Sequence, residues 1–326
     1  MTIVRLKIIT GFIVQNRWVQ ALIGLCISSF LTFFAIENIA WVEINEGLRN
    51  LPIPILLIAS GPMALNIILR GARWYLLLPN ERIKFSSLLL VQNTGIGVNN
   101  ISPIRMISEP IQLALITRRY EIRFAKAFTG LIGGNFLDVL ASGSLIILGL
   151  LFVPALRDQA VSIPIFGAFI LFGVSTIVFI GVARGIHKLH FLSRFQYFHQ
   201  VIDSVQLLRE RPRNLVLSFT ATLGHWIALG LTVWILTFSL GIDISLIAIT
   251  VILVAATFFT SAVPSAPAGT GTYHFAVVTM FVTMGIDPSI AFSFAIVMHL
   301  MSVLPSSAIA LIMVWKWGVH TIFEAK

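Results

Sequence analysis

The chain has 326 residues, of which 57% are hydrophobic and 11% are charged. Soluble domains average roughly 45–50% apolar and about 25% charged residues, so this composition excludes an ordinary soluble protein and predicts an integral membrane protein. The net charge of +9 does not indicate nucleic-acid binding, because the basic residues gather between apolar runs, as in the cytoplasmic loops of membrane proteins.

Three apolar runs in the first half are long enough to be membrane spans. Residues 18–36 exceed the roughly 7–15-residue core of a signal peptide and no cleavage site follows, so we expect a retained first span. Residues 53–69 predict a kinked second span that ends at RGARW, residues 70–74, a basic and aromatic interface anchor. Residues 124–153 predict a third, tilted span with Asp138 near its middle.

Between the second and third of these spans, residues 86–116 are apolar at both ends but wrong for a membrane helix in the middle. Poor helix formers and two ionisable residues fill this centre: Gly95, Gly97, Asn99, Asn100, Pro103, Arg105, Glu109 and Pro110. Irregular backbone survives at membrane depth only where protein or a water-filled cavity surrounds it. The stretch therefore predicts a broken, re-entrant element and a candidate site.

The second half shows the same order of elements. Residues 244–284 form an apolar run that is interrupted by VPSAPAGTGTYHF, residues 263–275, and predict a second broken element. Residues 184–213 are basic with helical apolar spacing, which is typical of a helix on the cytoplasmic surface. The remaining predicted spans are 164–182, 215–240 and 289–314.

The distribution of Lys and Arg predicts the topology. Segments 1–17, 70–84, 118–126, 184–213 and 316–326 hold 3, 4, 4, 6 and 2 of them, whereas the intervening loops hold only Arg49 and Arg157. By the positive-inside rule these segments, with both termini, are cytoplasmic.

The two broken elements then enter the membrane from opposite faces. The chain becomes a single membrane domain, 1–326, with about six full spans and two re-entrant elements in an inverted repeat of halves 1–155 and 156–326. Paired Gly/Pro-interrupted segments in corresponding places of two halves point to a transporter binding site. A helix over residues 110–119 would be about 15 Å long, half of a hydrocarbon core of roughly 30 Å.

We expect the tips of the two elements to meet near the bilayer centre, since each supplies the polar partners that the other needs. The facing residues would be Asn99, Ser102, Arg105 and Glu109 on one tip and Gly269, Thr270, Thr272 and His274 on the other. Both half-helices would aim N–H groups at an anionic headgroup. Arg105 and Glu109 could instead be a structural pair, and Asp138 a hydrogen-bonded packing group.

Four blocks carry a resemblance to a known family: RGARW (70–74), SPIRMISEP (102–110), PSAPAGTGTYHFA (264–276) and MHLMSVLP (298–305). In this order they resemble the flippase-like family named for the transmembrane region of lysylphosphatidylglycerol synthase. The resemblance implies roles for Arg105 and Glu109 in the first broken element, for Gly269, Gly271 and His274 in the second, and for His299 in the last span. The chain departs from the family pattern at Gln112, where a second Arg is common, and at Ala268, where a Gly is common.

The sequence thus predicts a translocator of lipids or lipid-linked precursors that binds an anionic headgroup near the bilayer midplane. The candidate substrate-binding residues are Asn99, Ser102, Arg105, Glu109, Gly269, Thr270, Gly271, His274 and His299, with Arg73 and Asp138 as secondary candidates. The expected partners are membrane lipids, anionic or polyprenyl-phosphate linked, in the cell membrane, and not nucleic acid.

A membrane-embedded lipid-modifying enzyme and an accessory subunit that assists such an enzyme are the alternative functions. No H-E-x-x-H, P-loop or G-x-S-x-G motif is present, and we expect neither catalysis nor the synthase's soluble domain. No cofactor or metal is expected, because the only cysteine, Cys26, lies in an apolar run.

Overall fold

Helices make up every regular element in the part of the chain that the structure describes. The structure, a computed structural model, describes residues 17–37, 39, 41–42, 44, 52–79, 81–102, 107–157, 210–239 and 241–317. No strand occurs within these ranges, which confirms the predicted all-helical class. The predicted surface helix, apart from its last residues, and both chain termini lie outside them.

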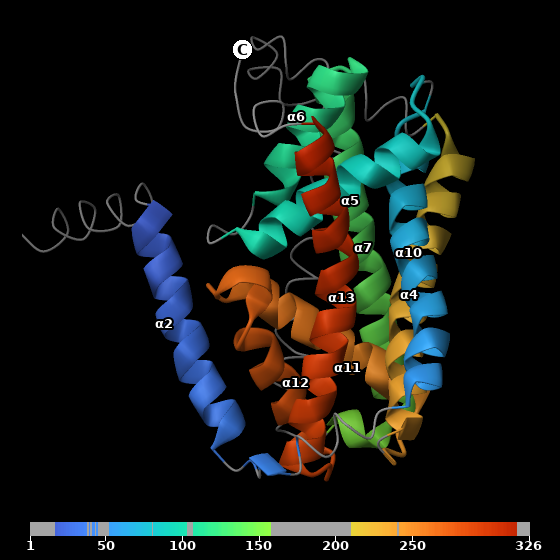
Figure 1. The fold of residues 1–326 in the computed structure, drawn as a ribbon. Helices are drawn as coiled ribbons and strands as arrows, with labels where there is room; N and C mark the ends of the chain where they lie inside the picture. The colour runs from blue at the N-terminus through green and yellow to red at the C-terminus, as the bar shows by residue number, and fades with distance from the viewer. Residues whose placement is uncertain are drawn as a thin grey trace, which may run out of the picture.

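Four of the described helices are long and apolar enough to cross a membrane. They are α4 (Ile53–Leu76), α7 (Phe124–Phe152), α10 (Pro212–Ser239) and α13 (Pro288–Trp317). Even the 24 residues of α4 give a length of about 36 Å, which exceeds a hydrocarbon core of roughly 30 Å. The 20-residue α2 (Arg17–Ile36) runs along one side of the bundle (Figure 1). Five predicted spans therefore coincide with helices, while the sixth, 164–182, lies outside the described residues.

The helix α4 is longer than its apolar run, and this changes the interpretation of RGARW. The motif forms the last turns of α4 instead of a surface loop. Arg73 and Trp74 are buried, with 5% and 2% of their surface exposed. The predicted interface anchor is therefore wrong, because Arg73 faces Gly134 and Asp138 of α7, and Trp74 packs in an apolar cluster with residues of α7 and of the two helices before it.

The first broken element consists of α5 (Phe85–Ile101) and α6 (Ser108–Tyr120). The predicted non-helical centre is wrong as far as Ile101, because α5 continues through Gly95 and Gly97; α6 begins at Ser108, and residues 103–106 lie outside the described part. Both glycines serve close packing: a Cβ at Gly97 would overlap the backbone of Ser306 in α13, and one at Gly95 would lie 2.8 Å from the carbonyl oxygen of Ser108. The break is thus shorter than the glycines suggest.

The second broken element consists of α11 (Leu246–Ala262), the short 3-10 helix η3 (Pro267–Gly269) and α12 (Thr272–Thr283). The chain reverses here through three residues of positive φ, namely Ala268 (56°), Gly269 (77°) and Gly271 (84°). Figure 1 shows α5 and α6 entering from one end of the bundle and α11 and α12 from the other. The two elements touch in the interior, where η3 contacts α5.

One residue in this reversal, Ala268, adopts a left-handed conformation that L-residues disfavour by roughly 1–2 kcal/mol. Ala268→Gly should therefore raise the free energy of unfolding by about 0.5–1 kcal/mol, after the greater chain entropy of glycine is subtracted. The matched control is Ala266→Gly, where φ is −57° and glycine should only destabilise. Equilibrium unfolding in detergent micelles measures both, and a less stable Ala268→Gly protein would contradict the strain.

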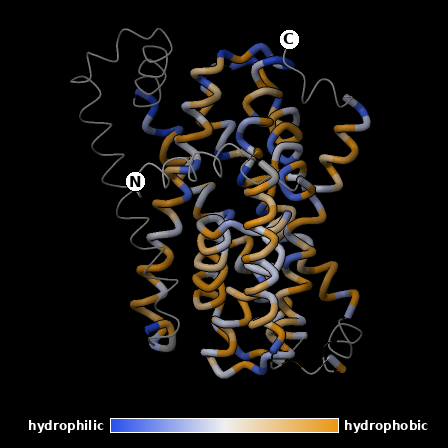
Figure 2. Tube along the Cα trace, turned by 90° about the vertical axis from the view of Figure 1, so that its left-hand side faces the viewer, coloured by the Kyte–Doolittle hydropathy of each residue, from blue (hydrophilic) through white to orange (hydrophobic). Residues whose placement is uncertain are grey.

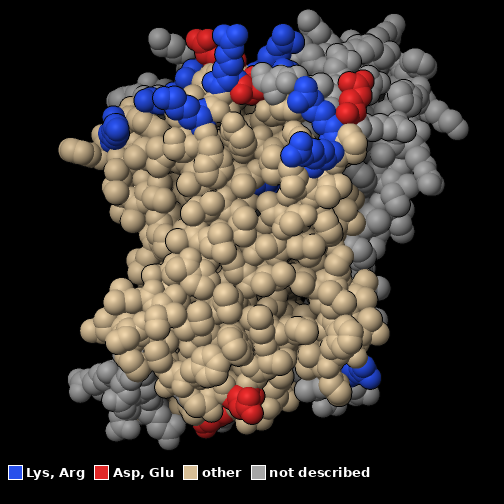
Figure 3. Space-filling view, turned by 90° about the vertical axis from the view of Figure 1, so that its right-hand side faces the viewer, with Lys and Arg blue, Asp and Glu red and all other residues tan. Residues whose placement is uncertain are grey.

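The surface divides into an apolar belt and charged ends. Figure 2 shows hydrophobic residues along the helices and hydrophilic ones mainly toward their ends, and Figure 3 shows Lys and Arg gathered at one end of the molecule. Large apolar side chains are exposed between the ends, among them Leu22, Phe30, Leu57, Val216 and Leu304. A band of this kind is suited to contact with lipid, as expected of a multi-pass membrane protein.

Candidate functional site

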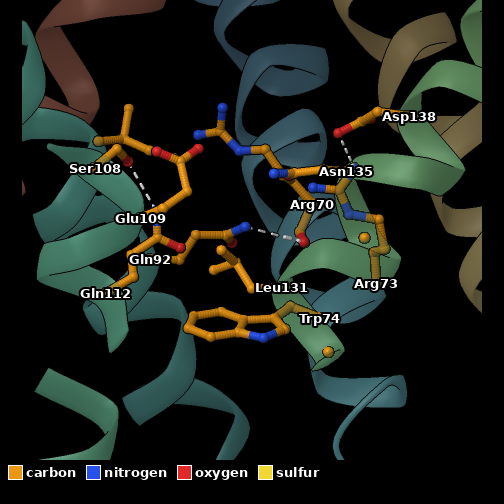
Figure 4. Close-up of a pocket in the computed structure, with 13 residues that line it drawn as sticks. Arg70, Arg73, Trp74, Gln92, Ser108, Glu109, Gln112, Leu131, Asn135 and Asp138 are labelled. Atoms are coloured by element: carbon orange, nitrogen blue, oxygen red, sulfur yellow. Dashed lines mark hydrogen bonds and ion pairs between the residues drawn. The ribbon is translucent and has the colours of Figure 1, made fainter. Parts of the chain in front are cut away.

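A polar cavity of about 200 Å³ lies between α4, α5, α6 and α7 (Figure 4). Helix α4 contributes Arg70, Arg73 and Trp74, and α5 contributes Gln92 and Ile96. The other lining residues are Ser108, Glu109 and Gln112 of α6 and Gly130, Leu131, Gly134, Asn135 and Asp138 of α7. Eight of these thirteen side chains are polar or charged, which is unusual inside an apolar bundle and indicates a functional site.

Helical spacing explains how α4 and α7 form two walls of this cavity. Asn66, Arg70 and Arg73 are four and three residues apart, so they share one face of α4. On α7, Gly130 and Gly134 let α4 approach closely: a Cβ at Gly134 would lie 3.3 Å from Nε of Arg73. Such small-xxx-small spacing is typical of helix contacts in membranes.

Asp138 is the centre of a buried hydrogen-bonded network that joins three helices. Its Oδ2 forms an ion pair with Arg73 of α4, and its Oδ1 lies 2.8 Å from Nε2 of His225 in α10. The other ring nitrogen of His225, Nδ1, lies 3.3 Å from Nδ2 of Asn66, which also donates to the His225 carbonyl oxygen at 2.8 Å. This pattern fits a neutral imidazole that accepts at Nδ1 and donates from Nε2 to Asp138.

Several buried polar atoms around the cavity have no hydrogen-bond partner among the described residues. Three are donors, Nε of Arg70, Nε of Arg73 and Nε1 of Trp74, and one is an acceptor, Oε1 of Gln92. The Arg70 guanidinium makes no ion pair with any described carboxylate. Leaving a buried polar group unsatisfied costs about 1–3 kcal/mol. The excess of donors indicates that the cavity suits a ligand rich in acceptor oxygens.

The first turn of α6 also faces the cavity. Ser108, Glu109 and Gln112 line it, and the residue before the helix, Ile107, supplies no side-chain cap to the first N–H groups. Glu109 is helical here, although a residue before proline is expected to be extended. Pro110 is accommodated because the first N–H groups of a helix have no partner within it. The positive end of the α6 dipole is thus directed at the cavity.

The predicted residues of the second element lie together in its reversal and line no part of this cavity. Nδ1 of His274 accepts from the Gly271 N–H at 3.3 Å, and Nε2 of His299 lies 3.1 Å from the Ala268 carbonyl oxygen. The two imidazole rings are 4.8 Å apart. Thr270 is exposed, and its hydroxyl donates to the Pro267 carbonyl at 2.9 Å. These contacts fix the shape of the reversal.

The predicted site is thus divided between two regions. Arg73, Glu109 and Asp138 line the cavity, whereas Gly269, Thr270 and Gly271 lie in the reversal between α11 and α12. His274 in the first turn of α12 and His299 in α13 form hydrogen bonds with the reversal. Between the two regions lie Asn99 and Ser102, at the end of α5, where Oδ1 of Asn99 accepts from the Ile107 N–H at 3.1 Å. Arg105 lies outside the described residues, and its predicted role remains a prediction.

Two residues of the cavity and its hydrogen-bonded network, Arg70 and His225, are absent from the site predicted from the sequence. Arg70 was assigned to a loop, although its spacing of three residues from Arg73 fits one helix face. No signal in the sequence marks His225 as part of this network, because its partner Asp138 is 87 residues away. In the described part of the chain, no group of three His, Cys, Asp or Glu side chains is placed to hold a metal ion.

Comparison with known proteins identifies the same family as the sequence blocks. Residues 21–310 match the family described as "Lysylphosphatidylglycerol synthase TM region". The chain is also similar to a UPF0104 membrane protein of Methanothermobacter thermautotrophicus. The two are 22% identical over 274 residues, which cover 76% of this chain and 77% of that protein.

Proposed function

The chain belongs to the lysylphosphatidylglycerol synthase TM region family, and we propose that it is a translocator of lipids or lipid-linked precursors with an anionic headgroup. The headgroup binds in the cavity between α4, α5, α6 and α7. The observation that carries this proposal is the Arg70 guanidinium, a cation without an ionic partner among the described residues, at depth in a protein with a lipid-facing belt. Intramembrane ionisable groups of this kind mark substrate pathways.

The charges of the cavity support a phosphate-ester anion as the ligand. The ion pair with Asp138 neutralises Arg73, which leaves Arg70 and the N-terminus of α6 to bind the anion. Figure 4 shows Arg70 and Glu109 reaching into the space from α4 and α6. Glu109 would accept hydroxyl or ammonium donors from the same headgroup, as in glycerol or sugar derivatives.

The arrangement of the broken elements supports transport rather than binding alone. We interpret α5–α6 and α11–α12 as re-entrant elements of an inverted repeat, since they enter from opposite ends and meet where η3 contacts α5. In transporters with such repeats, one half moves against the other around a fixed site near the midplane. Helix α5 connects the two regions, because it both lines the cavity and contacts the second element.

The charge distribution supports an orientation for the protein. Lys and Arg gather at the end of the bundle that lies beyond the last turn of α4, close to the cavity (Figure 3). The positive-inside rule assigns this end to the cytoplasm. We propose that the cavity belongs to the cytoplasmic half of a cell-membrane protein with both termini inside.

The proposal predicts that Arg70→Ala loses affinity for anionic lipid. A hydrogen bond to a charged group contributes about 1.5–3 kcal/mol, so binding of dioctanoyl phosphatidylglycerol should weaken by about 10–100-fold. Arg70→Lys should recover only part of the affinity, because the planar fork is lost. Microscale thermophoresis of the purified proteins in micelles measures the dissociation constant of the lipid for each of them.

The matched control is Arg82→Ala, which removes an exposed arginine that lies outside the cavity and should leave affinity unchanged. Arg70→Ala should unfold at the same temperature as the wild type, since no described carboxylate loses a partner. Wild-type affinity in a monodisperse Arg70→Ala protein would instead favour an accessory subunit.

A further inference from the structure

We propose that binding of the anionic headgroup is coupled to uptake of one proton by the Asp138–His225 pair, so that the protein carries a proton together with its substrate. The inference rests on the proposed function and adds the ion that would be transported with the lipid. It starts from a conflict in the cavity. Arg73 lines the cavity where the anion would bind, yet its guanidinium is already neutralised by the ion pair with Asp138.

The exposures of the three side chains show where a competing anion has access. The side chains of Arg73 and His225 are each 6% exposed, whereas that of Asp138 is 23% exposed and lines the cavity. A headgroup phosphate that enters the cavity therefore meets the Arg73–Asp138 ion pair at its open side. A phosphate that contacts both Arg70 and Arg73 competes with Asp138 for the Arg73 guanidinium, and Asp138 is left without a counter-ion if it loses this buried partner, which is costly.

A proton delivered to the pair removes this cost. His225 already donates from Nε2 to Oδ1 of Asp138, so a proton added at Nδ1 gives an imidazolium next to the carboxylate. Asp138 then exchanges the Arg73 guanidinium for the His225 imidazolium as its partner, and Arg73 becomes free for the phosphate. One bond forms, Nδ1–H of His225, as an O–H bond of hydronium breaks, and the proton returns to water when the lipid is released.

Asn66 provides two alternative arrangements for this exchange. With neutral His225, Nδ2 of Asn66 faces Nδ1 of the imidazole at 3.3 Å. With a proton on Nδ1, rotation of the amide by about 180° would present its oxygen as an acceptor instead, in exchange for the hydrogen bond that Nδ2 donates to the His225 carbonyl oxygen. Asn66 is 5% exposed, so water cannot readily replace it in either state.

The charged groups that face the pair come from α4 and from the cavity wall. From α4, Arg70 and Arg73 face the pair, and from α6, Glu109 lies on the cavity wall. Helix α11, which packs on both α7 and α10, carries no charged residue. The histidine of α13, His299, is turned to the Ala268 carbonyl instead.

Calorimetry of the purified wild-type protein with dioctanoyl phosphatidylglycerol tests the coupling. Titrations at one pH in two buffers of different ionisation enthalpy give the number of protons taken up, which should approach one per lipid. The sign follows from linkage: because the complex holds the extra proton, affinity should fall as pH rises, by up to about tenfold per pH unit.

Two variants make the test specific. Asp138→Asn keeps the shape of the side chain but not the charge, so Arg73 is free and lipid should bind more tightly, without proton uptake and independently of pH. Glu81→Gln is the matched control, because Glu81 pairs with Lys126 outside the cavity, and it should keep the wild-type proton count.

The outcomes separate the two proposals. Lipid binding by the wild type with no proton uptake and no pH dependence would overturn the coupling and leave the proposed function intact. No binding of the lipid at any pH would overturn the proposed function itself. The wild-type proton count is decisive even if Asp138→Asn fails to fold.

Discussion

Asp138→Leu is expected to lower the free energy of unfolding by about 3–5 kcal/mol, because it leaves the buried Arg73 charge without a partner. The side chain of Arg73 is 6% exposed, so water cannot replace the carboxylate. The same change removes the acceptor of His225 Nε2. Equilibrium unfolding in mixed micelles measures the loss. The effect should exceed that of Glu81→Leu, since the cation left behind there, Lys126, is 30% exposed, and ion pairs that water can reach contribute roughly 0–1 kcal/mol.

The double variant Arg73→Met/Asp138→Leu is the decisive comparison. Replacing both members of a buried ion pair by apolar residues is often neutral, so most of the lost stability should return. The double-mutant cycle then gives a coupling energy that the two single variants do not show separately. A double variant that is as unstable as the sum of the single variants would show that the two charges act independently. The ion pair would then have no role in holding α4 against α7.

The sequence predicted the helices better than it predicted their partners. Apolar length and the Gly/Pro clusters are local signals, and they were sufficient to predict five of the helices and both broken elements. The network of Asp138 is not local, because Arg73 and His225 reach it from other helices. Asp138 therefore looked like a lone packing group, and only the packing of α4, α7 and α10 reveals what it binds.

Glycines illustrate the same limit. Gly95 and Gly97 were interpreted as helix breakers, which is their usual effect on an isolated helix. In the folded chain they lie inside α5, where their lack of a side chain admits the backbone of α6 and α13. The sequence gives no sign of which role applies, because Ser306 is more than two hundred residues from Gly97. The helix α5 ends only at Ile101, and the reversal of the second element uses the positive-φ residues near Gly269.

Close packing of α5 on α13 suggests how motion of one half would reach the cavity. One face of α5 carries Gln92 and Ile96, which line the cavity. Its other contacts include the hydrogen bond from Oγ of Ser306 to Oδ1 of Asn93, at 2.9 Å. Helix α5 thus joins the cavity in the first half to a span of the second half, and any displacement of α13 would move a cavity wall.

Gly97→Ala should accordingly lower the free energy of unfolding by about 3 kcal/mol or more, at or above the upper end of the usual loss from overpacking a core. The new Cβ would overlap the Ser306 carbonyl and lie 2.5 Å from Cβ of Ala310, and neither neighbour is a flexible side-chain end that can move aside. The two helices must separate, which also breaks the bond between Ser306 and Asn93. Unfolding in micelles measures the cost, and lipid affinity should fall with it because the Gln92 wall shifts.

The matched control for Gly97→Ala is Gly133→Ala in α7, where a Cβ would meet only Cδ1 of Leu77, at the ordinary contact distance of 3.8 Å. There the better helix propensity of alanine should leave stability equal or raise it by up to about 1 kcal/mol. If Gly97→Ala were as stable as this control, α5 and α13 would not be in backbone contact. Helix α5 would then not couple the cavity to α13. The proposal that the two halves of the chain move around one site would lose its structural support.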